Sequence, residues 1–226
     1  MSPLAILGAV LLASSAAAAP APLSPADPAA GFERVRSDKT GAQYADRRMK
    51  LLIDVPTGYV LVAPKKNQDV AYEFAFRHPT RRFEVRVSLS ALTEDAARAK
   101  EREACGKKEG CWMADLDAPS ETWGATVLFN IGGGDAPFYP FPPDGVKKEF
   151  AADWGYVSPP FELEPGHTFN DENYKLGQVV VIHRKGTGTV YRIVLADDIG
   201  DIKELDRPIF YGVRFEGAQP PGFPAK

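Results

Sequence analysis

Three histidines, His78, His167 and His183, are the residues of this sequence best suited to chemistry. His78 and His183 fall near the ends of two strand-like segments, 70–77 and 178–184, so they would approach each other if these segments paired in one sheet. Imidazole can bind a metal or act as a general base. The catalytic alternative is therefore a hydrolase or metal-dependent enzyme with a site around His78 and His183. No third or fourth ligand stands at a diagnostic spacing, and we predict no metal centre.

Other patterns that would indicate catalysis or cofactor binding are missing from the sequence. A serine nucleophile in a GxSxG context does not occur, and a grouping of Ser88, His183 and Asp197 has no motif behind it. The glycines at 132–134 end an apolar helical stretch and do not open one, so their amides are not placed to cradle a phosphate. The sequence therefore predicts no cofactor.

The middle of the chain is rich in aromatic residues and prolines, in the runs APFYPFPP (136–143) and DWGYVSPPFEL (153–163). Aromatic side chains beside prolines can line a groove for an extended peptide or a sugar. They can equally cover the hydrophobic core. The candidate binding residues of this region are Tyr139, Phe141, Trp154 and Tyr156.

Strand signals dominate the segments that must position these residues. Apolar and polar residues alternate over 70–77 and again over 83–89, which predicts a hairpin. A second hairpin is predicted over 178–184 and 189–196, around the glycine-bearing turn 185–188. Charged residues occupy the other face of the first hairpin, and this face is predicted to be exposed to solvent. The charged residues are Glu73, Arg77, Glu84 and Arg86.

Helical signals separate the two hairpins. Thr93 followed by acids indicates a helix entry, Ser120 is a possible cap of the next helix, and glycines end that helix. The expected helices cover 93–105, 120–131 and 143–154. Runs of strands set apart from runs of helices favour an α+β fold, an antiparallel sheet built from two main hairpins with about three helices packed on it.

The first residues have the layout of a secretory signal peptide. An apolar run, 4–13, precedes small residues, and cleavage after Ala18 satisfies the usual small-residue pattern. The apolar run is shorter than the roughly 20 residues of a membrane span, so we expect no span in the mature chain. The expected organisation is a signal peptide (1–18), a flexible Pro- and Ala-rich leader (19–31) and one domain (32–226).

Cysteine spacing agrees with export to the periplasm or the medium, and the net charge limits the class of partner. Cys105 and Cys111 are too widely spaced for a CxxC redox pair, and in an oxidising compartment they predict a local disulfide. The formal charge is only −3. A nucleic-acid partner would require a basic surface, and none is predicted.

Several stretches resemble uncharacterised exported bacterial proteins: NIGGG (130–134), KKEFAADWG (147–155), GQVVVIHRKGTGTVYRIVLADD (177–198), and the YEFAF and FEVRVSL of the first hairpin. The order of strands and helices also resembles the PsbP-type fold, an antiparallel sheet with helices packed on its faces. Fold does not determine function, so this resemblance implies no chemistry.

The function expected from the sequence is that of an exported, non-catalytic domain. Its expected partner is a protein, peptide or sugar of the cell envelope, bound through the aromatic and proline-rich segments.

Overall fold

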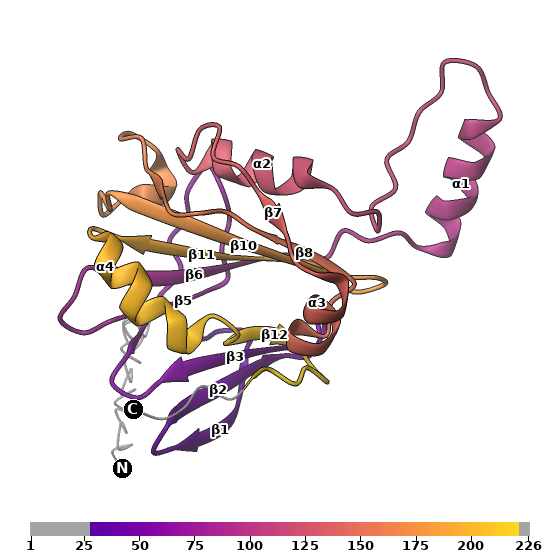
Figure 1. Ribbon diagram of the computed structural model, residues 1–226. Helices are drawn as coiled ribbons and strands as arrows, with labels where there is room; N and C mark the ends of the chain where they lie inside the picture. Colours follow the sequence, from indigo (N-terminus) through magenta and orange to yellow (C-terminus); the bar gives the residue numbers. More distant parts are fainter. Residues whose placement is uncertain (1–27, 222–226) are drawn as a thin grey trace, which may run out of the picture.

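The computed structural model describes residues 28–221, and at its centre lies an eight-stranded antiparallel sheet in the order β4-β5-β6-β11-β10-β8-β7, with β9 paired to β10 (Figure 1). Its strands are β4 (Val60–Val62), β5 (Phe74–Arg77), β6 (Phe83–Ser90), β7 (Tyr139–Pro140), β8 (Trp154–Val157), β9 (Phe161–Glu162), β10 (Leu176–Arg184) and β11 (Gly188–Ala196). Both predicted hairpins, β5–β6 and β10–β11, are present, and they meet where β6 pairs with β11. The α+β fold class is confirmed.

A second sheet of four strands packs against one face of the first. It runs in the order β1 (Glu33–Asp38), β2 (Gly41–Asp46), β3 (Leu51–Pro56) and β12 (Val213–Phe215). Alternate residues of β3 are buried, as expected of a strand with one face in the core. Leu51, Ile53, Phe215 and the aromatic residues of β5 and β6 fill the space between the two sheets. The polar strands β1 and β2 gave no hydrophobic alternation by which to predict them.

The other face of the large sheet is covered by α2 (Glu121–Asn130) and by the segment 158–175, which contains the short helix η1 (Thr168–Asn170). Leu128 and Ile131, from α2 and its end, are fully buried against β10 and β11. Glu84 and Arg86 also lie on this face and are 0% and 2% exposed. The prediction that they face solvent was wrong, because alternation within a strand does not reveal that a distant loop will cover the polar face.

A further helix, α3 (Pro143–Phe150), closes one end of the space between the sheets, where Phe150 is buried. The predicted helix continued to Trp154, but the chain turns at Ala151, whose φ is +51°. Trp154 instead begins β8 and pairs with His183. The helical spacing of Val146, Phe150 and Trp154 arises because two different elements contribute buried residues.

The chain after β11 forms one irregular helical segment. It consists of α4 (Ile199–Asp201), a π-helical turn (Ile202–Asp206) and the 3-10 turn η3 (Arg207–Ile209). This segment lies across the opening between the two sheets (Figure 1).

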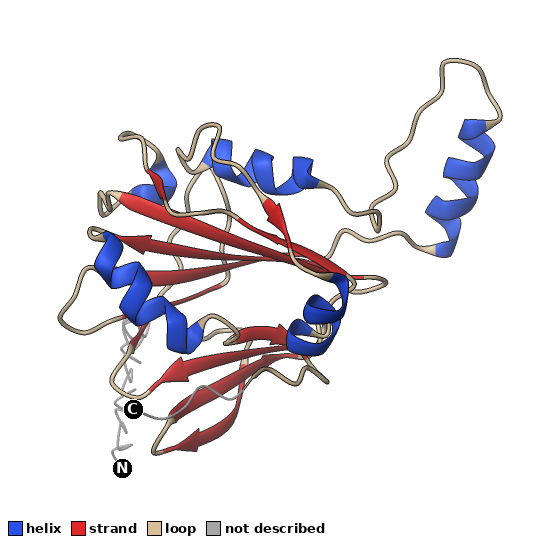
Figure 2. Cartoon of the chain, viewed as in Figure 1, coloured by secondary structure: helices blue, strands red, loops and turns tan. Residues whose placement is uncertain are grey.

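Of the three predicted helices, α1 (Ala96–Gly106) does not pack on the sheet. It stands away from the body, joined to it by two loops (Figure 2). Its N-cap is Asp95 and not Thr93, because the Asp95 side chain accepts from the amide of Arg98 at 2.7 Å.

The predicted signal peptide (1–18) and most of the predicted leader (19–31) fall outside the described residues. The last leader residues, 28–31, form a turn in which Ala29 is buried in the core. Within residues 28–221, no helix combines the length and apolar character needed to cross a membrane.

Candidate functional site

The structure directs attention to the segment 92–119, which we call the arm. It leaves the sheet after β6, forms α1, folds back through the loop after Cys105 and rejoins the body before α2 (Figure 1). Its tip extends away from the body, whereas both ends of the arm meet at a cluster of polar side chains on the sheet (Figure 1).

His183 is the centre of this cluster, which we call the anchor. Its imidazole is 0% exposed; Nδ1 lies 2.9 Å from Thr189 Oγ1 and Nε2 lies 3.0 Å from Asp117 Oδ1. The pairing register explains the arrangement, because Trp154, His183, Thr189 and Ser90 stand opposite one another on four adjacent strands. Directly opposed residues share a face of the sheet, so these side chains form a row.

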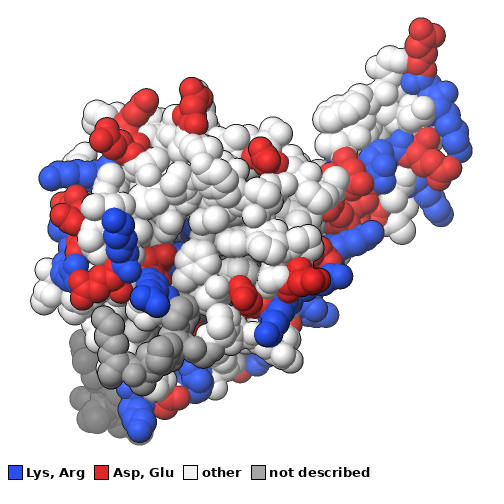
Figure 3. Space-filling view, viewed as in Figure 1, with Lys and Arg blue, Asp and Glu red and all other residues white. Residues whose placement is uncertain are grey.

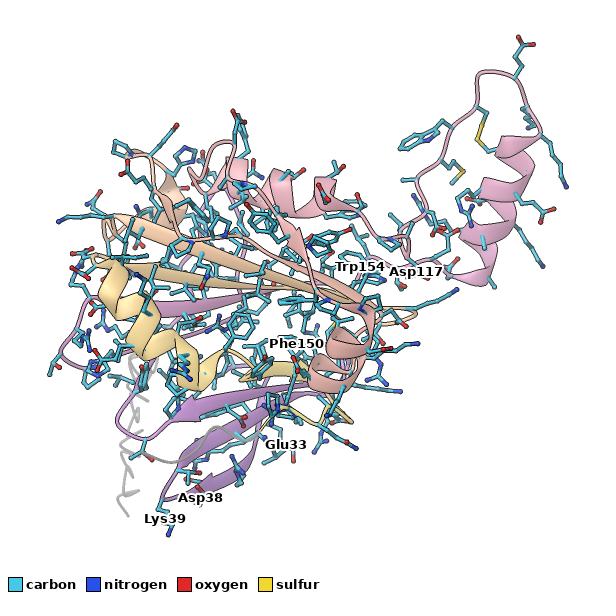
Figure 4. The ribbon with its side chains drawn as sticks, viewed as in Figure 1. Glu33, Asp38, Lys39, Asp117, Phe150 and Trp154 are labelled. Carbon is cyan, nitrogen blue, oxygen red and sulfur yellow. A yellow bond between two sulfur atoms is a disulfide. The ribbon has the colours of Figure 1, made fainter. Side chains whose placement is uncertain are left out.

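The arm contributes both of its ends to the anchor. Thr93, in the loop that leads from β6 into the arm, donates to Asp117 Oδ1 at 2.7 Å. It accepts from the amide of Gly186 at 3.1 Å. The indole Nε1 of Trp154 donates to the carbonyl of Asp117 at 3.0 Å. Trp154 also stacks on His183, with ring centroids 4.7 Å apart and planes inclined by 9°. Figure 4 shows Asp117 beside Trp154 where the arm leaves the body.

The environment favours an ionised Asp117 facing a neutral His183. Burial lowers the pKa of His183 below its ordinary value, and the hydrogen bond to Asp117 opposes this only in part. Burial alone would raise the pKa of Asp117, but hydrogen bonds from Thr93 and His183 hold it below its usual range. The consistent assignment is an imidazole that donates from Nε2 to Asp117 and accepts at Nδ1 from the hydroxyl of Thr189.

The anchor has the hydroxyl, imidazole and carboxylate order of a hydrolytic triad, with Thr189 in the place of the nucleophile. A substrate could not reach Thr189 in this arrangement, so the three groups are not placed for hydrolysis. Thr189 is 6% exposed, and the cavity beside it measures only about 10 Å³, the space of one water molecule. This cavity is walled by Leu92 and Leu116 of the arm and by Trp123 of α2. In this arrangement the chemistry available to the three groups is hydrogen bonding that holds the arm.

The tip of the arm is closed by the predicted disulfide between Cys105 and Cys111, whose Cα atoms are 5.3 Å apart. The next residue, Trp112, is 83% exposed, more than any other large apolar side chain that the structure describes. Lys107 and Lys108 lie on the same tip, and Lys107 pairs with Glu103 at 2.8 Å. The tip therefore presents an indole ring beside exposed charged side chains.

The histidines predicted to approach each other are separated. His78 lies beside Phe83, at the start of β6, whereas His183 is aligned with Ser90 at its end. The eight residues of β6 are separated by seven steps of about 3.3 Å each, which puts about 23 Å between the two ends. The Nδ1 atom of His78 accepts from the amide of Arg81 at 3.1 Å. His167 has its own partner, with Nδ1 2.8 Å from the carbonyl of Asn130.

The four predicted binding aromatics do not line one groove. Tyr139 stands opposite Val157, and Pro140 opposite Tyr156, so Tyr139 and Tyr156 point to opposite faces of the sheet. Phe141 lies on the face of the second sheet and packs on Phe150 with centroids 5.3 Å apart. Trp154 lies on the face of Tyr156, 5.8 Å from it, and is 7% exposed.

Sequence reasoning missed the most informative residues, Asp117, Thr93 and Trp112. Asp117 lies in a loop without periodicity, and its partner His183 is 66 residues away. Trp112 carried one usable signal, since it follows a cysteine of a short disulfide loop in a polar region. No three His, Cys, Asp or Glu side chains between residues 28 and 221 are grouped to hold a metal ion.

Neither a protein-family model nor a curated protein matches the sequence. Among solved structures, the chain is similar to the solution structure of cyanobacterial PsbP (CyanoP) from Synechocystis sp. PCC 6803. The TM-score is 0.44 and the identity 14%, over 76% of this chain and 91% of that one. At this level the similarity says nothing of ligand or activity.

Proposed function

We propose that this chain is an exported, non-catalytic binding domain whose arm docks on a partner protein of the cell envelope. The observation that carries the proposal is the exposure of Trp112 at the tip of a disulfide-closed arm. An exposed indole is costly in water, and tryptophan is among the residues most often found at the energetic centres of protein interfaces.

Charge favours a protein over a lipid surface as the occupant. The arm carries five Lys or Arg and seven Asp or Glu, a formal charge of −2. Figure 3 shows these charges interspersed over the arm. Anionic lipid headgroups attract clusters of basic residues, and this mixture provides no such cluster. A pocket on a folded protein, apolar inside and acidic beside Lys108, fits the indole and its surroundings better.

The anchor supports a binding role. It uses a fully buried imidazole and three side-chain hydrogen-bonding groups to fix the two ends of an arm that hardly touches the body. A docking element that is fixed before binding loses less conformational entropy on association than a loose loop. The separation of His78 from His183 gives the enzyme alternative no support from geometry.

Site-specific crosslinking tests the proposal. A photoreactive phenylalanine analogue is placed at position 112 in cells of the source organism, with position 129 as the matched control, since Phe129 is 72% exposed on the body. We expect one exported protein to crosslink from position 112 and not from position 129. With that protein purified, Trp112→Ala should weaken binding by about tenfold or more, while Phe129→Ala should not.

Two results would refute the proposal. One is a crosslink from position 112 to lipid alone or to no specific protein. The other is a purified complex whose Kd is insensitive to Trp112→Ala.

A further inference from the structure

A cavity of about 420 Å³ opens beside the irregular helical segment that follows β11. This volume is within the range of small-ligand pockets. The residues that matter for its chemistry are Ile202, Lys203, Asp206, Arg207, Phe210 and Tyr211. It is separate from the arm and independent of the function proposed above.

The walls of the cavity are largely apolar. Ile202 is buried, and the rings of Phe210 and Tyr211 meet edge to face with centroids 5.1 Å apart. Tyr211 is held further by a hydrogen bond to Glu149, and burial raises the pKa of its hydroxyl. The rings are thereby fixed as a surface on which an apolar body can rest.

The charges around the cavity are unevenly paired. Acidic side chains of the helical segment already have partners from the sheet side: Asp201 and Glu204 pair with Arg81, and Asp206 pairs with the buried Arg192. Lys203 and Arg207, one helical turn apart and both exposed, have no hydrogen bond or ion pair with any residue in the described part of the chain. Figure 3 shows basic side chains over this segment, next to an uncharged area.

Arg192 adds to the positive potential. Its side chain is 2% exposed, and two of its nitrogens, Nε and Nη1, have no hydrogen-bond partner among the described residues. Asp206 offsets Arg192, and the single cation Arg81 is shared by Asp201 and Glu204, so with Lys203 and Arg207 the cations around the segment outnumber these acids by one. An anion at the mouth of the cavity would be attracted by the remaining positive charge.

The backbone of this segment has the π-helical turn Ile202–Asp206 between two other helix types. Such turns occur often at functional sites, because they give up regular packing for a particular placement of side chains. Here the turn places Asp206 on Arg192, while Lys203 within the turn and Arg207 directly after it stay at the rim of the cavity.

We infer that this cavity binds a small organic acid: an aromatic or branched apolar body in contact with Phe210 and Tyr211, with its carboxylate between Lys203 and Arg207. Arg and Lys are the usual partners of carboxylates, and charge-assisted hydrogen bonds are the stronger class.

Three probes and two variants of the mature protein test the inference. The probes are 3-phenylpropanoate, its neutral amide, and acetate, which keeps the charge but lacks the apolar body. In amide NMR titrations we expect 3-phenylpropanoate to shift resonances of 202–211, and to bind about tenfold or more tightly than either other probe. Lys203→Ala with Arg207→Ala should weaken its binding by a similar factor. The control, Lys147→Ala with Lys148→Ala on α3, also removes two exposed cations and should not.

Each alternative outcome overturns the inference. Equal binding of the acid and its amide would show that the cations play no part. Shifts that map elsewhere, or that survive Lys203→Ala with Arg207→Ala, would show that the ligand lies outside this cavity. Absence of binding at millimolar concentration would show that the cavity is not a site for such acids.

Discussion

Two buried polar clusters lie on the same face of the large sheet, one at each end, and they differ in charge. At one end the carboxylate of Glu84 pairs with Arg86 at 2.6 Å, and Arg86 also binds Asp171 at 3.0 Å and the carbonyl of Phe169. At the other end a neutral His183 bridges Thr189 and Asp117. Each cluster ties an irregular segment to the sheet, but only the second contains an imidazole, the side chain whose ordinary pKa is nearest to neutral pH.

The difference matches what each cluster holds. The Glu84 cluster fixes the segment 158–175, which is packed over the sheet and buries Phe169 and Tyr174. The His183 cluster fixes the arm, which buries little of its own surface. The first segment is therefore held by extensive apolar packing as well as by ion pairs, whereas the arm is held by the anchor with little apolar packing besides that of Leu116.

The largest expected effect comes from breaking the ion pair at the first end. Arg86→Met leaves the carboxylate of Glu84 buried without a cation, and we expect the free energy of unfolding to fall by about 3–5 kcal/mol. Replacing both partners, Glu84→Leu with Arg86→Met, should recover most of the loss, because no unpaired charge remains. Urea unfolding followed by circular dichroism measures both. If the double variant is no more stable than the single one, the clusters do not differ as described.

The next effect should be confined to the arm. Asp117→Ala removes the acceptor for Thr93 and His183. We expect the free energy of local opening of the arm to fall by about 1.5–3 kcal/mol. Amide hydrogen exchange should accelerate over 92–119 and stay unchanged over 158–175. The control is Glu109→Ala at the tip of the arm, an exposed carboxylate that forms no hydrogen bond or ion pair within the described residues. Equal protection of the arm in both variants would contradict the role assigned to the anchor.

Acidification should affect the His183 cluster through its imidazole, and the expected effect on stability is smaller than those of the two substitutions above. The pKa of His183 in the folded protein lies below its ordinary value of 6.5. The unfolded chain therefore takes up a proton first as the pH falls. Stability is fully present above 6.5, declines toward the folded pKa and levels off below it. His183→Gln should reduce this slope as the pH falls below the ordinary pKa of 6.5. An unchanged slope in the variant would assign the pH dependence to other groups.

Sequence reasoning succeeded for elements whose residues repeat locally. The alternation of Phe74 and Phe76 with polar neighbours, and the apolar runs of β10 and β11, predicted the two central hairpins correctly. It failed where the outcome depended on segments far apart in the chain. The burial of Arg86 depends on Phe169, 83 residues away. The anchor likewise joins an aperiodic loop to a strand, and nothing in the spacing of Asp117 and His183 indicates that they meet.

Trp154, within the candidate site, is a second case in which contacts with distant segments decided the outcome. An aromatic residue in a proline-rich region predicts a binding surface, yet the ring is stacked on His183 and its Nε1 donates to the arm. Its companion Trp112 had no such context and is the exposed indole. The residue types that a binding protein uses can be read from the sequence. Which of these residues reach the surface cannot be predicted from it.

The smallest expected effect on stability is that of Trp112→Ala, which sharpens the comparison between the arm and the body. Since Trp112 is 83% exposed, its truncation should change the free energy of unfolding by no more than about 0.5 kcal/mol. The matched variant Trp154→Ala removes a ring that is 7% exposed and should cost about 3–5 kcal/mol. Thermal and urea unfolding of the two variants measure the contrast. A large loss for Trp112→Ala would mean that the indole packs within this chain in solution, and it could then not serve as the docking residue of the arm.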